Sequence, residues 1–292
     1  MDTHDDYSFS KIELHQEKMP SFDGTKLHCS YVMQPHEASL IFFVHGYSNH
    51  TGLFEDTITW FFNQGFHVGI FDVRGHGKSE GRRGYVDDYS TYAKDMDIVL
   101  SNQVNACKPI STFVITLSTG GLIASYYLLS SYSSVKINSM VMCCPYFGMP
   151  AQMQPNNLKK MISRCVNFFY PYAHVPKPIL VDKITHSKKW REYFKNDPYR
   201  FSKTSVSWYF ACESAMKFVF SNINQWPKSV SMFMITSGID VVVDTEESKK
   251  LYDKMNSINK KYHNYDNMCH QILNDENSEE VYQEIGSWLK DK

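Results

Sequence analysis

The sequence lacks the patterns that mark exported, membrane-spanning and metal-binding proteins. No window reaches about 18 uninterrupted apolar residues, the length that a transmembrane helix requires. The first residues, MDTHDDYSFSKIELHQEK, contain several charges and no apolar core of a signal peptide, so we expect no export by that route. Neither a Cys-x-x-Cys pair nor a His-Glu-x-x-His run occurs, and we therefore expect no metal and no other cofactor.

The chain also has almost no net charge and no cysteine pattern typical of disulfides. The 292 residues carry a formal net charge of -1, which gives no basis for a nucleic-acid partner. The seven cysteines are an odd number and include the adjacent Cys143 and Cys144 within an apolar run, which is typical of buried thiols rather than of a disulfide framework. We expect a cytoplasmic protein in a reducing compartment.

Apolar runs that alternate with helical stretches predict an α/β fold with a mostly parallel, eight-stranded sheet and helices on both faces. An Asp23-Gly24 turn signal predicts an antiparallel hairpin at the start of the chain, and the spacing of Val281, Ile285 and Leu289 predicts a final helix over 278–290. The expected strands cover residues 11–15, 25–32, 40–44, 67–71, 113–116, 137–144, 230–235 and 260–265.

Residues 147–228 interrupt this alternation. The segment shows no convincing parallel strand and is rich in Met, Phe, Tyr and Trp. We find no flexible Gly/Ser linker and no fixed-period repeat that would indicate tethered modules. The sequence therefore predicts one core domain, residues 1–146 and 229–292, with residues 147–228 inserted as a helical cap.

The most informative stretch is Ile-Thr-Leu-Ser-Thr-Gly-Gly, residues 115–121. A β-branched run leads directly into Ser118 and two glycines, which predicts a strand, a sharp turn and a helix with the serine at the apex. This is the pattern of an activated serine nucleophile, although Thr116 stands where the usual motif has glycine. We expect Thr116 either to crowd the turn or to extend the strand by one residue.

A serine nucleophile needs a general base and an orienting carboxylate, which in this kind of fold follow in the order Ser, Asp, His. Asp240 lies in the loop after the strand predicted at 230–235, and His270 lies in the loop after the strand predicted at 260–265. Asp244 competes with Asp240, but the following Thr-Glu-Glu predicts that it caps a helix. We therefore predict a Ser118, Asp240 and His270 triad.

Two backbone amides are predicted to stabilise the oxyanion that forms when the serine attacks an ester. One belongs to Thr119, at the start of the helix after the nucleophile, where the helix dipole adds partial positive charge. The second belongs to Tyr47, because Gly46 permits a close approach of the backbone. The hydroxyl of Tyr47 is a further candidate donor.

Together these motifs resemble the monoacylglycerol lipase and lysophospholipase branch of the serine α/β hydrolases, the serine aminopeptidase S33-like hydrolases. The resemblance implies the α/β-hydrolase fold and assigns His45, Gly46, Asp72 and Arg74 to structural support near the site rather than to contact with substrate. It spans about residues 20–290. The motifs are Val-His45-Gly46-Tyr47, Phe-Asp72-Val-Arg74-Gly-His-Gly-Lys-Ser-Glu-Gly81, the Ser118 turn, Pro145-Tyr-Phe-Gly, Asp240-Val-Val-Val-Asp and His270-Gln-Ile-Leu-Asn. The stretch Asp197-Pro-Tyr-Arg200-Phe is similar to one in bacterial lysophospholipases.

The resemblance implies a carboxylic ester hydrolase that releases a fatty acid from monoacylglycerol or lysophospholipid through a Ser118 acyl-enzyme. An S33-like peptidase and a non-catalytic lipid-binding homologue remain as alternatives, and Thr116 is the argument for the second. Met and aromatic residues in the predicted cap suit an acyl chain. A positive excess in the cap predicts transient contact with a membrane surface. Its basic residues are Lys159, Lys160, Arg164, Lys177, Lys183, Lys188, Lys189 and Arg191.

Overall fold

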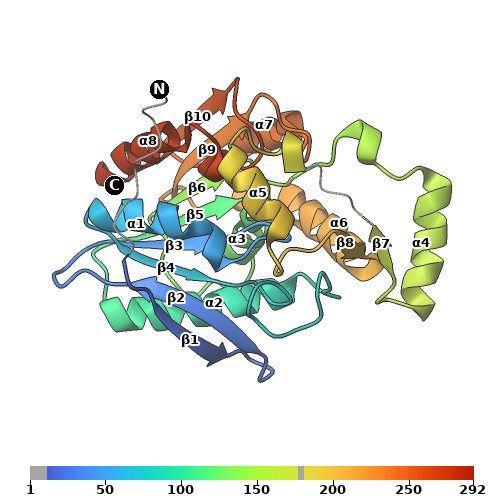
Figure 1. Ribbon diagram of the computed structural model, residues 1–292, viewed down its shortest axis with the longest axis horizontal. Coiled ribbons are helices and arrows are strands. Elements are labelled where there is room, and N and C mark those ends of the chain that lie inside the picture. The colour runs from blue at the N-terminus through green and yellow to red at the C-terminus, as the bar shows by residue number, and fades with distance from the viewer. Residues whose placement is uncertain (1–11, 177–180) are drawn as a thin grey trace.

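The computed structural model describes residues 12–176 and 181–292, which build a layered α/β structure around one eight-stranded sheet (Figure 1). The strand order is β1-β2-β4-β3-β5-β6-β9-β10, and only β2 runs in the direction opposite to that of the other seven strands. The predicted mostly parallel eight-stranded sheet is therefore confirmed. The strands are β1 (His15–Pro20), β2 (Lys26–Val32), β3 (Leu40–Val44), β4 (His67–Phe71), β5 (Thr112–Leu117), β6 (Ser139–Cys143), β9 (Ser231–Ser237) and β10 (Lys260–Tyr265).

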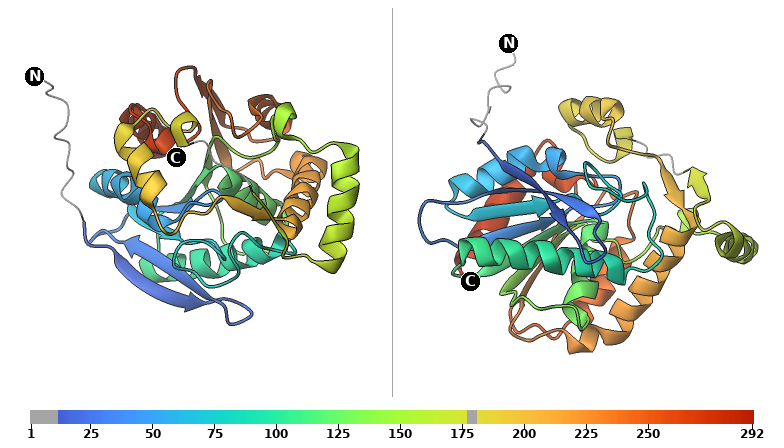
Figure 2. Two further views of the ribbon diagram at one scale, coloured as in Figure 1. Left: turned by 45° about the vertical axis from the view of Figure 1, so that its right-hand side comes forward. Right: turned by 90° about the horizontal axis from the view of Figure 1, so that it is seen from below.

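Helices cover both faces of the sheet, as predicted (Figure 2). On one face, α1 and α8 pack against each other and bury residues such as Phe61 and Ile285. On the other face, α2 and α3 form a second apolar core that includes Leu100 and Leu122. The central strands are buried on both sides, which explains their continuous apolar runs. The helices of these layers are α1 (Glu55–Asn63), α2 (Ser90–Cys107), α3 (Thr119–Leu129), α7 (Thr245–Lys254) and α8 (Ser278–Lys290).

The first strand differs from its prediction. We expected it at residues 11–15, but β1 covers His15–Pro20, and Lys11 lies outside the described residues. The turn at residues 21–25 places Gly24 at φ 84°, so pairing with β2 continues to Pro20 directly before the turn. Residues of this edge strand are largely exposed and polar, and such a strand lacks the apolar signal on which the prediction depended.

The segment between β6 and β9 contributes no strand to the main sheet among its described residues. Two short strands in it pair with each other in antiparallel orientation, a feature that the sequence did not predict. Helix α6 packs against α3 of the core, and α4 packs on α6 at the margin of the molecule (Figure 1). The elements are η2 (Ala151–Met153), α4 (Asn157–Phe169), β7 (His174–Pro176), η3 (Val181–Lys183), α5 (Lys188–Asn196), β8 (Lys203–Ser205), α6 (Val206–Asn222) and η4 (Ile223–Gln225).

None of the helices in the described parts of the chain is both long enough and apolar enough to cross a membrane. The most exposed helix is α4, which has no buried residue.

Candidate active site

Ser118 lies at the predicted sharp turn between β5 and α3. Its backbone adopts φ 56° and ψ -122°, a conformation that side chains other than glycine rarely adopt and that stores strain. The backbone is held in place because Ser118 N donates to Cys143 O (3.0 Å) and Tyr146 N donates to Ser118 O (3.0 Å). Although Ser118 precedes α3, its side chain makes no capping hydrogen bond. The hydroxyl therefore stays available for chemistry.

Two glycines allow the serine turn to approach the loop after β3. A Cβ atom on Gly120 would lie 2.0 Å from Val44 O, and a Cβ atom on Gly46 would lie 2.9 Å from Ser118 Cβ. Side chains at these positions would push the two segments apart, because real Cβ atoms do not approach so closely. The glycines therefore bring the loop of Tyr47 next to Ser118.

Thr116 fits the fold without crowding the turn. It pairs with Val44 on one side and Met142 on the other, so β5 is extended through the position where the usual motif has glycine. Its hydroxyl is buried and donates to Val141 O (3.4 Å). Space for the side chain exists because it faces Gly121, where a Cβ would come within 3.4 Å of Thr116 Oγ1.

His270 and Asp240 form a buried pair. His270 Nδ1 lies 2.8 Å from Asp240 Oδ2, and both side chains are nearly inaccessible to solvent. Burial by itself would raise the pKa of Asp240, but the charge of His270 and hydrogen bonds from His270 and the amides of Val242 and Val243 lower it below its ordinary value. The carboxylate is thus ionised and accepts from the imidazole at Nδ1, which leaves Nε2 outside this pair.

Asp244 caps the start of α7, as predicted. It precedes α7 and its carboxylate accepts from the amides of Glu246 (3.0 Å) and Glu247 (3.2 Å). These hydrogen bonds satisfy amides at the helix start that have no partner within the helix. Asp244 is therefore engaged as a helix cap, and the carboxylate paired with His270 is that of Asp240.

One cavity of about 160 Å³ is lined by both Ser118 and His270. Tyr47 and Thr119 line the same cavity, and their backbone amides donate to no acceptor in the described parts of the chain. No hydrogen bond joins Ser118 to His270 among the same residues, and catalytic hydrogen bonds of this kind commonly shorten only in the complex with substrate. The fold thus brings together the five residues predicted for chemistry.

The Tyr47 hydroxyl does not take the role of a second oxyanion donor. It donates to Lys203 O (2.8 Å) at the start of β8, and the ring packs against Trp208 at a centroid distance of 4.2 Å. The side chain therefore joins the loop after β3 to the segment between β6 and β9. Only the backbone of Tyr47 remains for the oxyanion.

His45 and Asp72 organise the loops behind the site. His45 Nδ1 donates to Gly46 O (2.8 Å), and Nε2 accepts from Val73 N (2.9 Å). Burial lowers the pKa of His45 to about 4, so the ring is neutral at pH 7, as this pattern of one donor and one acceptor requires. Asp72 accepts from Thr51 N (2.6 Å) and Lys78 N (2.7 Å), and so ties the loop after β3 to the loop after β4.

Arg74 acts farther from the cavity. Its Nε and Nη2 each lie 2.8 Å from the carboxylate of Asp95 on α2, and its Nη1 bonds to Asp23 and Thr25 in the turn between β1 and β2. Arg74 therefore fastens the first hairpin to α2 and does not line the cavity of Ser118.

Sequence analysis did not single out Arg200 as a site residue. It lines the cavity of Ser118, and its guanidinium stacks over Phe194 at 4.2 Å. The Nη1 atom is buried and has no hydrogen-bond partner among the described residues, and burial lowers the pKa of Arg200 to about 10. The available sequence signal was the Asp197-Pro-Tyr-Arg200-Phe stretch, which indicates a family resemblance but not a buried guanidinium.

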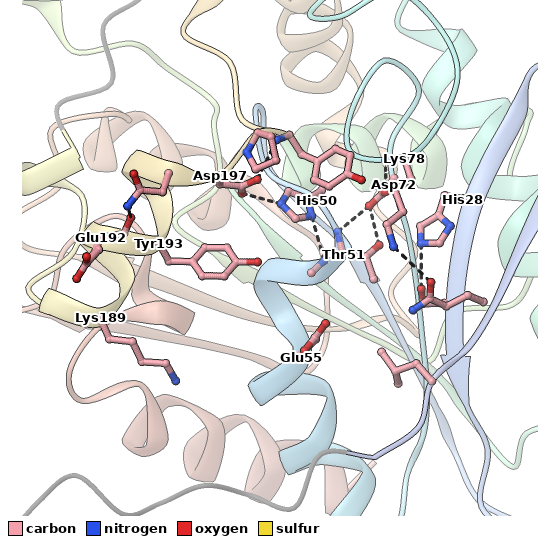
Figure 3. A pocket seen from close by; sticks show the side chains of 17 residues that line it. His28, His50, Thr51, Glu55, Asp72, Lys78, Lys189, Glu192, Tyr193 and Asp197 are labelled. Carbon is pink, nitrogen blue, oxygen red and sulfur yellow. Dashed lines mark hydrogen bonds and ion pairs between the residues drawn. The ribbon is translucent and has the colours of Figure 1, made fainter.

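A larger cavity of about 560 Å³, whose lining includes His50 and charged side chains such as Asp72 and Asp197, is separate from that of Ser118 (Figure 3). His50 Nε2 donates to Asp197 Oδ2 (2.7 Å), and its Nδ1 accepts from Gly52 N (3.1 Å). This pair joins the loop after β3 to the segment between α5 and β8. Neither Ser118 nor His270 lines this cavity, so the candidate catalytic residues lie in a smaller cavity.

A third cavity, of about 490 Å³, is apolar and lies between α4 and α6. Met153 lines both this cavity and that of Ser118, so the two cavities are adjacent at this side chain. The other apolar lining residues include Met149, Ile162, Val206 and Trp208.

The fold and the serine turn define an α/β hydrolase, and comparison with known proteins shows its family. Residues 35–277 match the family described as serine aminopeptidase, S33. The chain belongs to this family, within the monoacylglycerol lipase and lysophospholipase branch that the sequence predicted. The predicted α/β-hydrolase fold and the prediction of a hydrolase of the lipase and esterase type are confirmed.

Individual relatives are distant. Phospholipase YtpA of Bacillus subtilis is 24% identical over 244 residues, which cover 84% of this chain and 92% of the relative. Human monoglyceride lipase is 22% identical over 283 residues, covering 92% of this chain and 88% of the relative. The solved structure of a soluble variant of monoglyceride lipase from Saccharomyces cerevisiae, in complex with a substrate analogue, superposes with a TM-score of 0.87 at 19% identity, covering 98% of this chain and 97% of that one.

Proposed function

We propose that the protein is a serine carboxylic ester hydrolase that releases a fatty acid from a lysophospholipid or monoacylglycerol, with Ser118 as nucleophile, His270 as general base and Asp240 as the residue that orients the base. The observation that carries this proposal is the strained Ser118 turn in one cavity with His270, whose other ring nitrogen is held by a buried carboxylate. A strained backbone at a serine that lines a cavity is expected where the turn serves chemistry.

The chemistry follows from this arrangement. His270 Nε2 takes the proton of Ser118 as Oγ attacks the ester carbonyl, and Asp240 stabilises the resulting imidazolium. The tetrahedral intermediate collapses, the C–O bond to the leaving alcohol breaks, and His270 returns the proton to that alcohol. Water then repeats the sequence on the acyl-enzyme and releases the fatty acid.

The negative charge of the intermediate is stabilised by the amides of Tyr47 and Thr119. Both residues line the cavity, and neither amide has an acceptor among the described residues, so the donors are available without first breaking another hydrogen bond. The start of α3 adds its partial positive charge at Thr119. Each such donor contributes roughly 3 to 4 kcal/mol to transition-state stabilisation.

The acyl chain of the substrate occupies the apolar cavity between α4 and α6. This cavity adjoins the cavity of Ser118 at Met153, a flexible side chain that lines both, and in the proposal the hydrocarbon tail passes it, away from the polar groups. Flexible methionines and aromatic rings adapt to such a chain. In this proposal, residues 147–228 form the cap of the site, and residues 1–146 and 229–292 form the core.

Arg200 favours a lysophospholipid over a monoacylglycerol. A buried guanidinium atom without an acceptor is costly unless a ligand supplies one, and phosphate oxygens are its best match. Lys183 adds a second positive charge to the cavity, whose described lining contains no carboxylate. This charge pattern also disfavours an aminopeptidase, which needs acidic groups for the ammonium of its substrate.

The proposal also includes transient contact of α4 with a membrane surface. Helix α4 exposes Leu158, Met161 and Phe168 together with Lys159 and Arg164, a combination suited to an anionic lipid surface. Lys177, which the sequence analysis counted among the basic residues of the cap, lies outside the described residues.

The first test is fatty-acid release from lysophosphatidylcholine and 1-monoacylglycerol of equal chain length. Ser118→Ala should abolish release from both substrates, whereas Ser131→Ala, at an exposed position just beyond α3, should not change it. Full activity of folded Ser118→Ala would exclude the mechanism. If wild-type protein releases nothing, labelling of Ser118 by a fluorophosphonate would favour a peptidase, and no labelling would favour a lipid carrier.

The second test concerns the headgroup. Arg200→Met should lower kcat/KM for lysophosphatidylcholine by roughly 10- to 150-fold, the loss expected for a hydrogen bond to a charged group, and leave monoacylglycerol turnover within a few-fold. Arg200→Lys, which keeps the charge but not the planar fork, should lose less. Equal losses on both substrates would show that Arg200 supports the fold rather than the headgroup.

A further inference from the structure

A cluster of side chains of the types that ligate metals lies beside the loop of His270 and outside the proposed triad. His186, Cys269 and Asp275 each offer one ligand atom, and these atoms lie within 4.8 Å of one another. The cluster forms where the chain before α5 meets the loop of His270: Thr185 Oγ1 donates to Asn274 O (2.8 Å). Two segments distant in sequence therefore place a thiol, an imidazole and a carboxylate at one point.

The distances within this cluster match those of a tetrahedral zinc site. His186 Nδ1 lies 3.3 Å from Asp275 Oδ2 and 3.7 Å from Cys269 Sγ. Zinc bonds of about 2.3 Å to sulfur and about 2.1 Å to nitrogen and oxygen place tetrahedral ligands about 3.6 Å (S to N) and about 3.4 Å (N to O) apart. The corresponding atoms are thus already spaced as two edges of such a tetrahedron.

The carboxylate is already held in position. Asp275 Oδ1 accepts from His186 N (2.5 Å) and Thr185 Oγ1 (3.1 Å), and Oδ2 accepts from Cys269 N (2.8 Å). Such bonds orient a ligand before the metal arrives. The imidazole of His186 has to turn before Nδ1 faces the site, because Cys269 Sγ lies as close to Nε2 (3.6 Å) as to Nδ1 (3.7 Å). The side chain of His186 is 39% exposed, which gives it room to turn and gives an ion a route from solvent.

We propose that His186, Cys269 and Asp275 form an inhibitory binding site for Zn²⁺ or a similarly soft divalent cation. The three side chains supply sulfur, nitrogen and oxygen ligands, and water completes the fourth position. Cysteine ligates zinc as the thiolate, so the thiol proton of Cys269 is released to solvent as the Zn–S bond forms.

Inhibition follows from the place of Cys269 in the chain. Cys269 directly precedes His270, whose imidazole is already fixed to Asp240 on one side. A zinc bond that draws Cys269 Sγ toward His186 pulls on this backbone and moves His270 relative to Ser118. Displacements of about 1 Å at a reacting group cost on the order of 100-fold in rate. This inhibitory effect rests on the proposed ester hydrolase, whereas zinc binding does not.

The sequence could not indicate this site. Metal motifs are recognised by short spacing, and Cys269 is 83 residues from His186. The absence of Cys-x-x-Cys and His-Glu-x-x-His therefore did not bear on a site assembled from two loops, and the proposal departs from our expectation of no metal.

Titration of the chelator-treated protein with Zn²⁺, followed by calorimetry, tests the binding directly. We expect one equivalent to bind to wild type, and at least a tenfold weaker affinity in Cys269→Ser and in His186→Ala. Cys165→Ser, at an exposed cysteine, is the matched control and should bind as wild type does. With Co²⁺ as probe, a thiolate-to-metal absorption band should appear in wild type and vanish in Cys269→Ser.

A second cluster in the protein provides the competing outcome, because the ligand atoms of Cys144, Asp240 and His270 also lie within 4.8 Å of one another. Unchanged zinc affinity in His186→Ala and Cys269→Ser would overturn the proposal, as would loss of binding in His270→Ala alone. Circular dichroism checks the fold of each variant, and the half-buried His186 gives the safer substitution.

The inhibitory effect is measured as the ratio of ester hydrolysis with and without Zn²⁺ within each variant. We expect wild type to lose activity upon zinc addition and to regain it with EDTA, and His186→Ala to be much less sensitive. Zinc bound at full occupancy without a change in rate would refute inhibition but not binding. Absence of ester hydrolysis in every sample would instead count against the proposed function.

Discussion

Replacement of Asp240 by asparagine separates its proposed role in orienting His270 from its contribution to the fold. The Asp240 carboxylate accepts from His270 Nδ1 (2.8 Å) and Ser237 Oγ (3.1 Å) on Oδ2, and from the amides of Val242 (2.8 Å) and Val243 (3.0 Å) on Oδ1. Asparagine can keep its carbonyl oxygen against the two amides. Its NH₂ group then faces His270 Nδ1, which is therefore forced to act as an acceptor.

This change reverses the tautomer of the imidazole. With Nδ1 unprotonated, the proton of neutral His270 lies on Nε2, the nitrogen that should accept the proton of Ser118. The expected loss in kcat is roughly 10⁴-fold, the size seen when a triad carboxylate becomes an amide. That factor corresponds to about 5.5 kcal/mol of activation free energy. The fold should be retained, because the two amide hydrogen bonds survive.

The assay is initial-rate release of fatty acid from lysophosphatidylcholine, together with the rate of fluorophosphonate labelling of Ser118. Asp244→Asn is the matched control: asparagine caps a helix as well as aspartate does, so α7 should keep its start and the rate should stay near that of wild type. An Asp240→Asn rate within tenfold of wild type would refute the assigned role. An equal loss in Asp244→Asn would refute the distinction between the two aspartates.

Three further outcomes test the structure. Thr116→Gly should leave the rate of ester hydrolysis within a few-fold of wild type but lower the free energy of unfolding, measured in urea, by about 1 to 2 kcal/mol. The loss is expected because the substitution removes the hydrogen bond to Val141 O and a buried β-branched side chain from β5. A large gain in activity would instead show that Thr116 strains the turn. The pKa of His45 is about 4 in the folded state and near 6.5 in the unfolded chain, so between these values the unfolded chain binds more protons and the free energy of unfolding falls as pH falls. His45→Gln should reduce the slope of the free energy of unfolding against pH in this window by about 1.4 kcal/mol per pH unit. An unchanged slope would contradict burial of a neutral imidazole. Replacing Phe168 and Phe169 by serine should weaken sedimentation with anionic vesicles without changing hydrolysis of a water-soluble ester, whereas unchanged sedimentation would exclude α4 as the membrane contact.

Local sequence patterns predicted the parts of this fold that depend on burial along one strand or helix. The apolar runs at β3 and β4 and the helical spacing of α8 were located correctly because their side chains face a core on one or both sides. The same logic failed for β1, an exposed edge strand, and for the short hairpin of β7 and β8, which has no apolar alternation.

Chain order and turn chemistry determined which side chains were candidates for catalysis. Ser118 precedes two glycines, and His270 follows the last strand. Asp240 follows a buried strand and, unlike Asp244, does not precede a helix that it would cap. Each of these signals lies within a few residues, so each could be recognised without knowing what lies opposite.

Only the tertiary structure decided what surrounds these groups. The buried guanidinium of Arg200 and the cluster of His186, Cys269 and Asp275 arise from segments that the chain brings together over long separations. The engagement of the Tyr47 hydroxyl by Lys203 O is of the same kind. Burial, unpaired donors and ligand distances are properties of packed neighbours rather than of neighbours in sequence, and no local pattern encodes them.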